Sequence, residues 1–169
     1  MFAYVGSQLG TADPVVAASV AFQGVTSRLA AAVLTANHSL ETGIEAPFAA
    51  VRWRATDRGV RLGLTPLVTG RAVPWAEAVA RLVEEAFVPW VACARREVRI
   101  GERLLWGNAA ASLVTLAQQL GADRSAALDA LPMIGLAELM PSSYWRTTCC
   151  LIDQVPGYGR CGECSLERF

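Results

Sequence analysis

The sequence predicts an α+β fold, a mainly helical single domain with a β-hairpin and a cysteine-rich C-terminal loop region. Three observations predict it. Several segments place apolar residues at helical spacing, one short segment alternates apolar residues with arginines as strands do, and the last segment is rich in Gly, Pro and Cys. The 169-residue chain is 53% hydrophobic, which is enough for a core that needs no disulfides. We expect residues 1–140 to form the helical part, with the hairpin at about 50–65, and residues 141–169 to form the C-terminal segment of the same domain.

The first long helix is predicted to begin at Asp13 and Pro14. A carboxylate at the N-cap followed by proline in the first turn is a typical helix start. The residues that follow are apolar on most sides of the helix, which indicates a central position in the core. We expect Gly43 to end this helix.

The segment "AAVRWRATDRGVRLGL", residues 49–64, has the alternation of a β-hairpin. One predicted face is apolar and contains Val51, Trp53, Ala55, Val60, Leu62 and Leu64. The other face carries Arg52, Arg54 and Arg61. A solvated outer face is the favoured interpretation. The alternative is a surface for an anionic or oxygen-rich ligand, which makes Arg52 and Arg54 candidate substrate-binding residues.

A second long helix is predicted from Pro74 to about Arg96, with a kink or break at Pro89. A third follows in "GERLLWGNAAASLVTLAQQLG", residues 101–121. Glycine weakens a helix relative to alanine, so Gly107 within it predicts a close packing contact. A short helix capped by Asp123 should come next, and short helices and loops should fill the chain beyond Pro132.

The composition excludes several classes of function. Fifteen basic and fifteen acidic residues cancel, so there is no electrostatic case for nucleic-acid binding. Every basic residue is arginine, which excludes a P-loop lysine and Schiff-base chemistry. No apolar run reaches the length of about 18 residues that predicts a transmembrane segment. The N-terminus does not resemble a signal peptide, so we expect a cytoplasmic protein, with peripheral association at the inner face of the membrane left open.

Four of the five cysteines fall within sixteen residues, as Cys149, Cys150, Cys161 and Cys164. In a reducing compartment such a cluster indicates metal or redox chemistry. Four thiolates suit zinc or an iron–sulfur cluster. Adjacent side chains in an extended segment point to opposite sides, which is awkward around one tetrahedral ion. The adjacent pair Cys149–Cys150 therefore favours a 2Fe–2S cluster, by a modest margin.

Other interpretations of these cysteines explain the sequence less well than a metal centre with four thiolate ligands. A Rieske centre needs two histidines, and the chain has only His38. A thioredoxin-like pair would use Cys161 and Cys164 alone, and a disulfide between adjacent cysteines is strained. Residues 157–162 match GxGxxG, but only seven residues follow, too few for a dinucleotide-binding unit. Electrons would then arrive from another protein or from a small reductant. Cys93 stands apart, as a small apolar core residue.

Two motifs resemble a known family. "RTTCCLIDQVPGYGRCGECSL", residues 146–166, resembles the C-terminal motif of the FhuF-like ferric-siderophore reductases, with its Cys-Cys-x10-Cys-x2-Cys spacing. "RLLWGNAAASL", residues 103–113, is similar to the Leu-Trp-(Gly/Ser)-Asn helix of the same family. Together the two motifs cover about the last two-fifths of the chain.

The resemblance implies a cytoplasmic enzyme whose C-terminal iron–sulfur loop region holds a 2Fe–2S cluster. The ligands would be the four clustered cysteines, Cys149, Cys150, Cys161 and Cys164. The substrate would be a ferric siderophore, usually of the hydroxamate type, and one electron would reduce its Fe(III) to Fe(II). An electron-donor protein such as a ferredoxin or a reductase would supply that electron.

The resemblance also marks two further candidate residues. Arg146 matches the family arginine and is expected near the cluster or the substrate. Trp106 is expected beneath the cluster loop, with a plain core position as the alternative. Two other functions stay open: a zinc-stabilised binding or accessory module, and a 2Fe–2S electron carrier or redox sensor.

Overall fold

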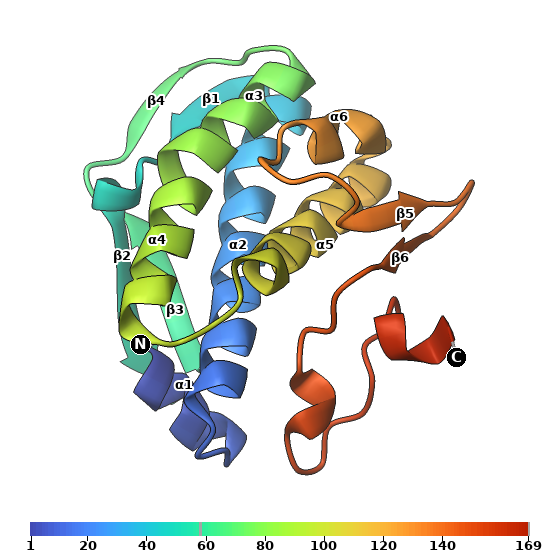
Figure 1. Ribbon diagram of the computed structural model, residues 1–169. Coiled ribbons are helices and arrows are strands. Elements are labelled where there is room, and N and C mark those ends of the chain that lie inside the picture. Colours follow the sequence, from blue (N-terminus) through green and yellow to red (C-terminus); the bar gives the residue numbers. More distant parts are fainter. Residues whose placement is uncertain (58, 169) are drawn as a thin grey trace.

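The fold is α+β and mainly helical, as predicted from the sequence (Figure 1). The computed structural model describes residues 1–57 and 59–168. Two long helices, α2 (Pro14–Ser39) and α5 (Glu102–Leu120), pack against each other at the centre. The shorter helices surround them: α1 (Phe2–Leu9), α3 (Trp75–Leu82), α4 (Val88–Glu97) and α6 (Arg124–Asp129). In the described part of the chain, the strands form three separate two-stranded antiparallel sheets.

Helix α2 begins as the sequence predicts. The Asp13 carboxylate accepts hydrogen bonds from the backbone N–H groups of Val15 (2.7 Å) and Val16 (3.4 Å), and Pro14 occupies the first turn. These bonds satisfy two donors that a helix leaves free at its start. Phe22 and Leu34 on this helix are fully buried in the core.

The predicted end of this helix at Gly43 is wrong, because the helix ends at Ser39. Gly43 lies instead in β1 (Thr42–Glu45), which pairs with β4 (Val68–Arg71). A Cβ on Gly43 would lie 2.6 Å from the carbonyl oxygen of Arg71, so the strand pairing needs glycine here. The glycine therefore marks a close approach of two strands rather than a helix cap.

Helix α2 is also long and apolar enough to cross a membrane, by length and composition alone. An 18-residue stretch of this helix has a mean hydropathy of 1.3, and 56% of that stretch is buried inside the protein. A helix surrounded by other elements of its own fold has the same composition as a membrane span. The expectation that the chain has no transmembrane segment stays a prediction.

The predicted hairpin forms from β2 (Val51–Thr56) and β3 (Gly59–Leu64), paired in antiparallel register. Val51, Leu62 and Leu64 pack against the core as expected. Trp53 does not, since 43% of its surface is exposed. Its assignment to a buried face is wrong because the hairpin covers the helices with only part of that face.

The second predicted helix is interrupted, as Pro89 suggested, but the break begins before the proline. A π-helical turn at Val83–Phe87 separates α3 from α4. Proline has no N–H to donate to the carbonyl four residues earlier, so the preceding turn must widen or kink. Pro89 lies in the first turn of α4, directly after this π-helical turn.

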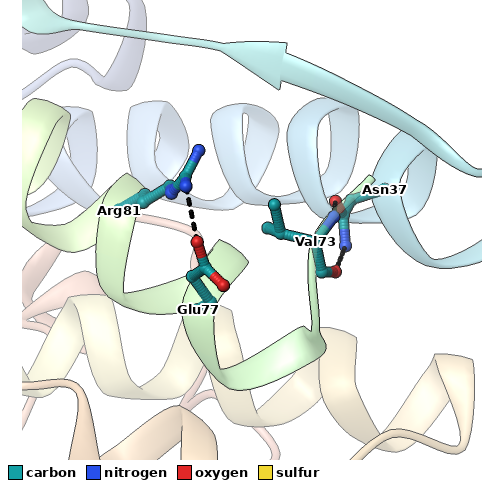
Figure 2. Close-up of polar contacts among 4 residues, drawn as sticks. All are labelled: Asn37, Val73, Glu77 and Arg81. Carbon is teal, nitrogen blue, oxygen red and sulfur yellow. Dashed lines mark hydrogen bonds and ion pairs between the residues drawn. The ribbon is translucent and has the colours of Figure 1, made fainter. Parts of the chain in front are cut away.

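Polar contacts join α2 to the start of α3 (Figure 2). The side-chain amide of Asn37 donates to the Val73 carbonyl and accepts from the Val73 N–H, both at 2.9 Å. On α3, Arg81 and Glu77 form an ion pair at 2.5 Å, one helical turn apart. The Asn37 bonds therefore fix the chain between β4 and α3 to the central helix.

A short hairpin spans the expected boundary at residue 140, in a part of the chain where the sequence predicts short helices and loops. Strands β5 (Ala137–Leu139) and β6 (Tyr144–Arg146) pair beside α5, and 3-10 turns follow at Ile152–Gln154 and Ser165–Arg168. Arg124 on α6 donates three hydrogen bonds to carbonyl oxygens in the turn that joins the two strands. Beyond β6 the chain runs back along the α2–α5 pair (Figure 1).

Candidate metal centre

The fold brings the two cysteine pairs together just after β6. The backbone N–H of Arg146 donates to the Glu163 carbonyl (3.3 Å), which places the second pair beside the end of the strand. The N–H of Cys164 donates to the Cys161 carbonyl (3.1 Å) and closes the turn between them. The Sγ atoms of Cys150 and Cys161 consequently lie 3.8 Å apart.

This sulfur–sulfur distance fits thiolates that share a metal. Two sulfurs bound tetrahedrally with metal–sulfur bonds of about 2.3 Å lie about 3.8 Å from each other. A disulfide needs a separation of about 2.05 Å, and all the cysteines are free. Cys150 and Cys161 therefore occupy adjacent corners of a potential coordination site.

The other two predicted ligands are less closely gathered. The Sγ of Cys149 accepts from the N–H of Leu151 (3.3 Å) and lies 3.5 Å from the Asp153 carboxylate. Leu151 has a left-handed backbone, with a φ of 65°, which turns the chain sharply after the cysteine pair. Within residues 1–57 and 59–168, no three His, Cys, Asp or Glu side chains are placed together as ligands of one ion.

The four cysteines divide into a buried pair and a partly exposed pair. Cys150 and Cys164 have 2% and 1% of their surface exposed, whereas Cys149 and Cys161 are half-buried. In Cys149–Cys150 and in Cys161–Cys164 alike, one cysteine is buried and the other is half-buried. A group held by all four would have one side against the protein and one side toward solvent.

The thiol pKa values reflect these surroundings. Burial raises the pKa of Cys149 to about 11, and the nearby Asp153 adds to this effect. The hydrogen bond shared with Cys161 lowers the pKa of Cys150 to about 6 and raises that of Cys161. The positive charge of Arg146 lowers the pKa of both Cys150 and Cys161. The pair thus loses one proton easily and holds the other strongly.

Arg146 lies directly behind the cysteines, with 1% of its surface exposed. Its guanidinium donates to the side-chain oxygens of Asn108 and Gln23, the latter at 3.3 Å. Both partners are neutral amides, and no carboxylate in the described part of the chain forms an ion pair with Arg146. The expected arginine is therefore a buried cation next to the cysteine loop.

The two motifs quoted above meet in space. A Cβ on Gly107 would lie 1.8 Å from Thr148 Oγ1, so the cysteine segment packs directly on the α5 backbone. The close contact predicted at Gly107 is confirmed. Asn108, the next residue, holds Arg146. Trp106 is 2% exposed and belongs to the main core, with its Nε1–H donating to Glu102 (3.3 Å).

Unpartnered polar atoms gather at this place. Among the described residues, three buried side-chain N or O atoms have no hydrogen-bond partner, and two of them are Arg146 Nε and Thr148 Oγ1. The third, Trp90 Nε1, lies on α4. Buried donors of this kind are normally satisfied, so Arg146 Nε indicates an acceptor that completes the site. Thr148 Oγ1 instead packs against the α5 backbone at Gly107. Soft thiolates next to an unpaired guanidinium N–H fit a bound metal–sulfur group.

The remaining candidates lie elsewhere. Arg52 and Arg54 are exposed on β2, which lies on the far side of α2 from the C-terminal segment (Figure 1). Arg52 donates to the backbone carbonyls of Ala49 (2.6 Å) and Val51 (3.1 Å). The structure therefore does not bring these two arginines to the cysteines.

The sequence analysis missed the buried polar residues that support the loop. Ser19 on α2 donates to the Cys150 carbonyl (2.7 Å), and Asn108 Nδ2 donates to the Ser19 carbonyl (3.1 Å) and Oγ (3.0 Å). In the sequence, Asn108 belongs to a polar stripe of its helix together with Ser112, Thr115 and Gln119, and that pattern assigns it no role. The one available signal was its position directly after Gly107 in the quoted motif.

Comparison with known proteins identifies no family for the chain: no protein-family model matches it, and no curated protein matches its sequence.

Proposed function

We propose that this protein is a ferric-siderophore reductase that holds a 2Fe–2S cluster through Cys149, Cys150, Cys161 and Cys164. The observation that carries the proposal is the approach of the two cysteine pairs, with the Sγ atoms of Cys150 and Cys161 at 3.8 Å, beside a buried arginine that forms no ion pair within the described residues. The resemblance of the cysteine and Trp-Gly-Asn motifs to the FhuF-like reductases supports it. The activity would be cytoplasmic.

The residues of the chain have distinct parts in this proposal. Cys150 and Cys164 anchor the buried side of the centre, and the Ser19 hydrogen bond fixes the backbone of Cys150 to α2. Cys149 and Cys161 hold the side that faces solvent. When bound, the cluster supplies electrons one at a time, as the reduction of Fe(III) to Fe(II) requires. A siderophore and an electron-donor protein would approach the same solvent-facing side.

Reduction releases the iron because of ligand chemistry. Hydroxamate oxygens are hard ligands that hold Fe(III) strongly and Fe(II) more weakly. The enzyme therefore needs no pocket that encloses the whole siderophore. It needs only an electron source at an accessible edge, which the half-buried Cys149 and Cys161 would provide.

The test is a single-turnover experiment under anaerobic conditions. Protein reduced with dithionite and freed of excess reductant is mixed with a ferric hydroxamate, and Fe(II) is trapped with a chelator. We expect the cluster spectrum to reoxidise as Fe(II) appears, one Fe(II) per reduced cluster. A reduced cluster that stays reduced with several siderophores would contradict the reductase and leave a carrier or redox sensor.

A second function is favoured by one observation. The distance of 3.8 Å between Cys150 and Cys161 suits a single tetrahedral zinc as well as one iron of a cluster. The protein would then be a zinc-stabilised binding or accessory module without electron transfer. Colourless protein with one equivalent of tightly bound zinc after anaerobic purification from iron-replete cells would support this second function over the first.

A further inference from the structure

Resting on the proposed function, we infer that Arg146 is the fixed counter-charge of the metal centre and a positioning residue that raises its affinity and its reduction potential. The formal charges between residues 146 and 169 cancel, with three arginines and three acidic residues, so the sequence alone gives no direction for the potential. Burial separates these charges: Arg146 is 1% exposed, whereas Arg160 is exposed. Solvent screens a buried charge less than an exposed one, so Arg146 acts on the site more strongly than Arg160.

The first step is the missing anion. A buried guanidinium without a charged partner is strongly unfavourable. When one member of a buried ion pair is removed, the charge that is left behind destabilises the protein for the same reason. Arg146 donates to two neutral amides, and its Nε has no acceptor within the described residues. Such a cation persists in a fold when a negative group binds beside it.

The second step is the origin of that negative charge. Four thiolates around one divalent metal ion, or around a 2Fe–2S core with two ferric ions, carry a formal charge of about −2. The backbone N–H of Arg146 donates to the carbonyl of Glu163, between Cys161 and Cys164, and its guanidinium is connected to the Cys150 carbonyl through Asn108 and Ser19, so it lies close to the place where this charge would form. Arg146 thus complements either group electrostatically.

The third step is the rigidity of the arrangement. Asn108 accepts from Arg146 through its oxygen and donates to Ser19 through its nitrogen, and Ser19 in turn donates to the Cys150 carbonyl. This chain of hydrogen bonds links the guanidinium to the backbone of a ligand through α5 and α2. The cation is therefore held in place before any metal binds, which is the condition for effective charge compensation.

Reduction adds one negative charge to the centre. A nearby fixed cation stabilises the more negative, reduced form more than the oxidised form, because the attraction grows with the charge. Arg146 therefore raises the reduction potential. The reduction potential of such a cluster depends on the net charge around it and on hydrogen bonds to its sulfurs. Arg146 contributes the positive charge.

The experiment compares R146Q and R146K with a matched control, R160Q, which removes an exposed arginine from the same loop. The first measurement is the affinity of the metal-free protein for Co(II), followed through its thiolate charge-transfer bands. We expect R146Q to bind at least about tenfold more weakly than the wild type, R146K to recover much of the loss, and R160Q to match the wild type.

The second measurement is the reduction potential of the reconstituted cluster. We expect R146Q to lower it by at least about 60 mV, the one-electron equivalent of a tenfold change, with R160Q unchanged. Should R146Q fail to fold, Q23E decides the matter, because a carboxylate on the other partner of the guanidinium neutralises Arg146 and leaves the Asn108 bonds to Ser19 in place. It should weaken Co(II) binding in the same way.

The outcomes separate the two proposals. If the wild type assembles no cluster, the proposed function fails, while the Co(II) measurement still tests Arg146. If a cluster assembles and R146Q equals R160Q in both affinity and potential, Arg146 is only a structural residue and the inference is overturned. A loss in R146Q that lysine does not restore at all would also contradict a role for the charge.

Discussion

Replacement of Gly107 by alanine tests whether the cysteine loop depends on its contact with α5. The added Cβ would lie 1.8 Å from Oγ1 of Thr148 and 3.1 Å from its Cβ. The Oγ1 atom cannot stay in place, because real Cβ atoms essentially never show contacts under 3.0 Å, and the contact of 3.1 Å to the Thr148 Cβ is tighter than nine in ten real ones. Thr148 directly precedes Cys149, so any displacement is transmitted to the ligands.

The magnitude follows from two opposing effects. Alanine in place of glycine within a helix normally stabilises it by up to about 1 kcal/mol. Extra volume in a packed interior costs about 1–3 kcal/mol. The contact at Gly107 is with the root of the half-buried Thr148 side chain, not with the far end of a flexible one, so we take the upper part of this range. The G107A variant should lose about 1–2 kcal/mol of unfolding free energy.

The chain offers a matched control in Gly24, another glycine inside a long helix. A Cβ there would meet only the Nη1 atom of Arg28, at 2.8 Å, which is the far end of a flexible side chain. The G24A variant should therefore be as stable as the wild type or more stable, by up to about 1 kcal/mol.

Urea denaturation of the metal-free proteins, with Co(II) titration alongside, measures both consequences. We expect G107A to be less stable than the wild type and to bind Co(II) more weakly. The double variant G107A/T148A should recover part of both losses, since it removes the closest atom. A G107A protein as stable as G24A with unchanged Co(II) affinity would refute the packing of the cysteine loop on α5.

Three further predictions concern stability. D13A should lose about 1 kcal/mol of unfolding free energy by urea denaturation, because two N–H groups of α2 lose their acceptor, and D13N should lose less. S19A should lose about 1–2 kcal/mol, because the carbonyl of Cys150 is left buried without a donor, and an unchanged value would contradict the role of this bond. Burial raises the pKa of Tyr144 to about 12, against a hydrogen bond with Thr115 that lowers it, so its contribution to stability is complete below pH 10 and is lost as the pH rises toward 12. The wild type should therefore lose stability more steeply than Y144F over this interval, and parallel curves would contradict the assignment.

The parts of the fold that depend on local chemistry could be predicted from the sequence. The start of α2 follows from Asp13 and Pro14, whose cap and fixed φ act within a few residues. The interruption before Pro89 follows from a missing N–H. The function of Gly107 could be anticipated because a glycine inside a helix is unfavourable without a packing reason.

The parts that depend on distant partners could not be predicted. In the sequence, Gly43 has the features of a helix end. Its strand-pairing partner in the structure, Gly70, lies 27 positions away, so the local sequence does not indicate the pairing. Asn108 looked like one member of a polar stripe, yet it is completely buried and bonds to Ser19, 89 residues earlier. Buried polar residues and surface polar residues look the same in a sequence, so support networks of this kind become visible only in three dimensions.

The candidate site was predictable in its residues but not in its surroundings. The spacing of the four cysteines was enough to propose a common ligand group, and the structure places Cys150 and Cys161 in contact. Spacing gave no information about which cysteines face the protein interior. The burial of Cys150 and Cys164, and of Arg146 behind them, comes from the packing of the loop on α2 and α5.

The most direct test of the account is the metal content of the protein, purified without air, together with its EPR spectrum after dithionite reduction. We predict red-brown protein with iron and acid-labile sulfide in equal amounts, two of each per chain, and the signal of a reduced 2Fe–2S centre. Replacement of any one of Cys149, Cys150, Cys161 and Cys164 by alanine should abolish or change the visible spectrum. Protein that contains zinc in place of iron and sulfide, or a spectrum that survives these replacements, would contradict the account.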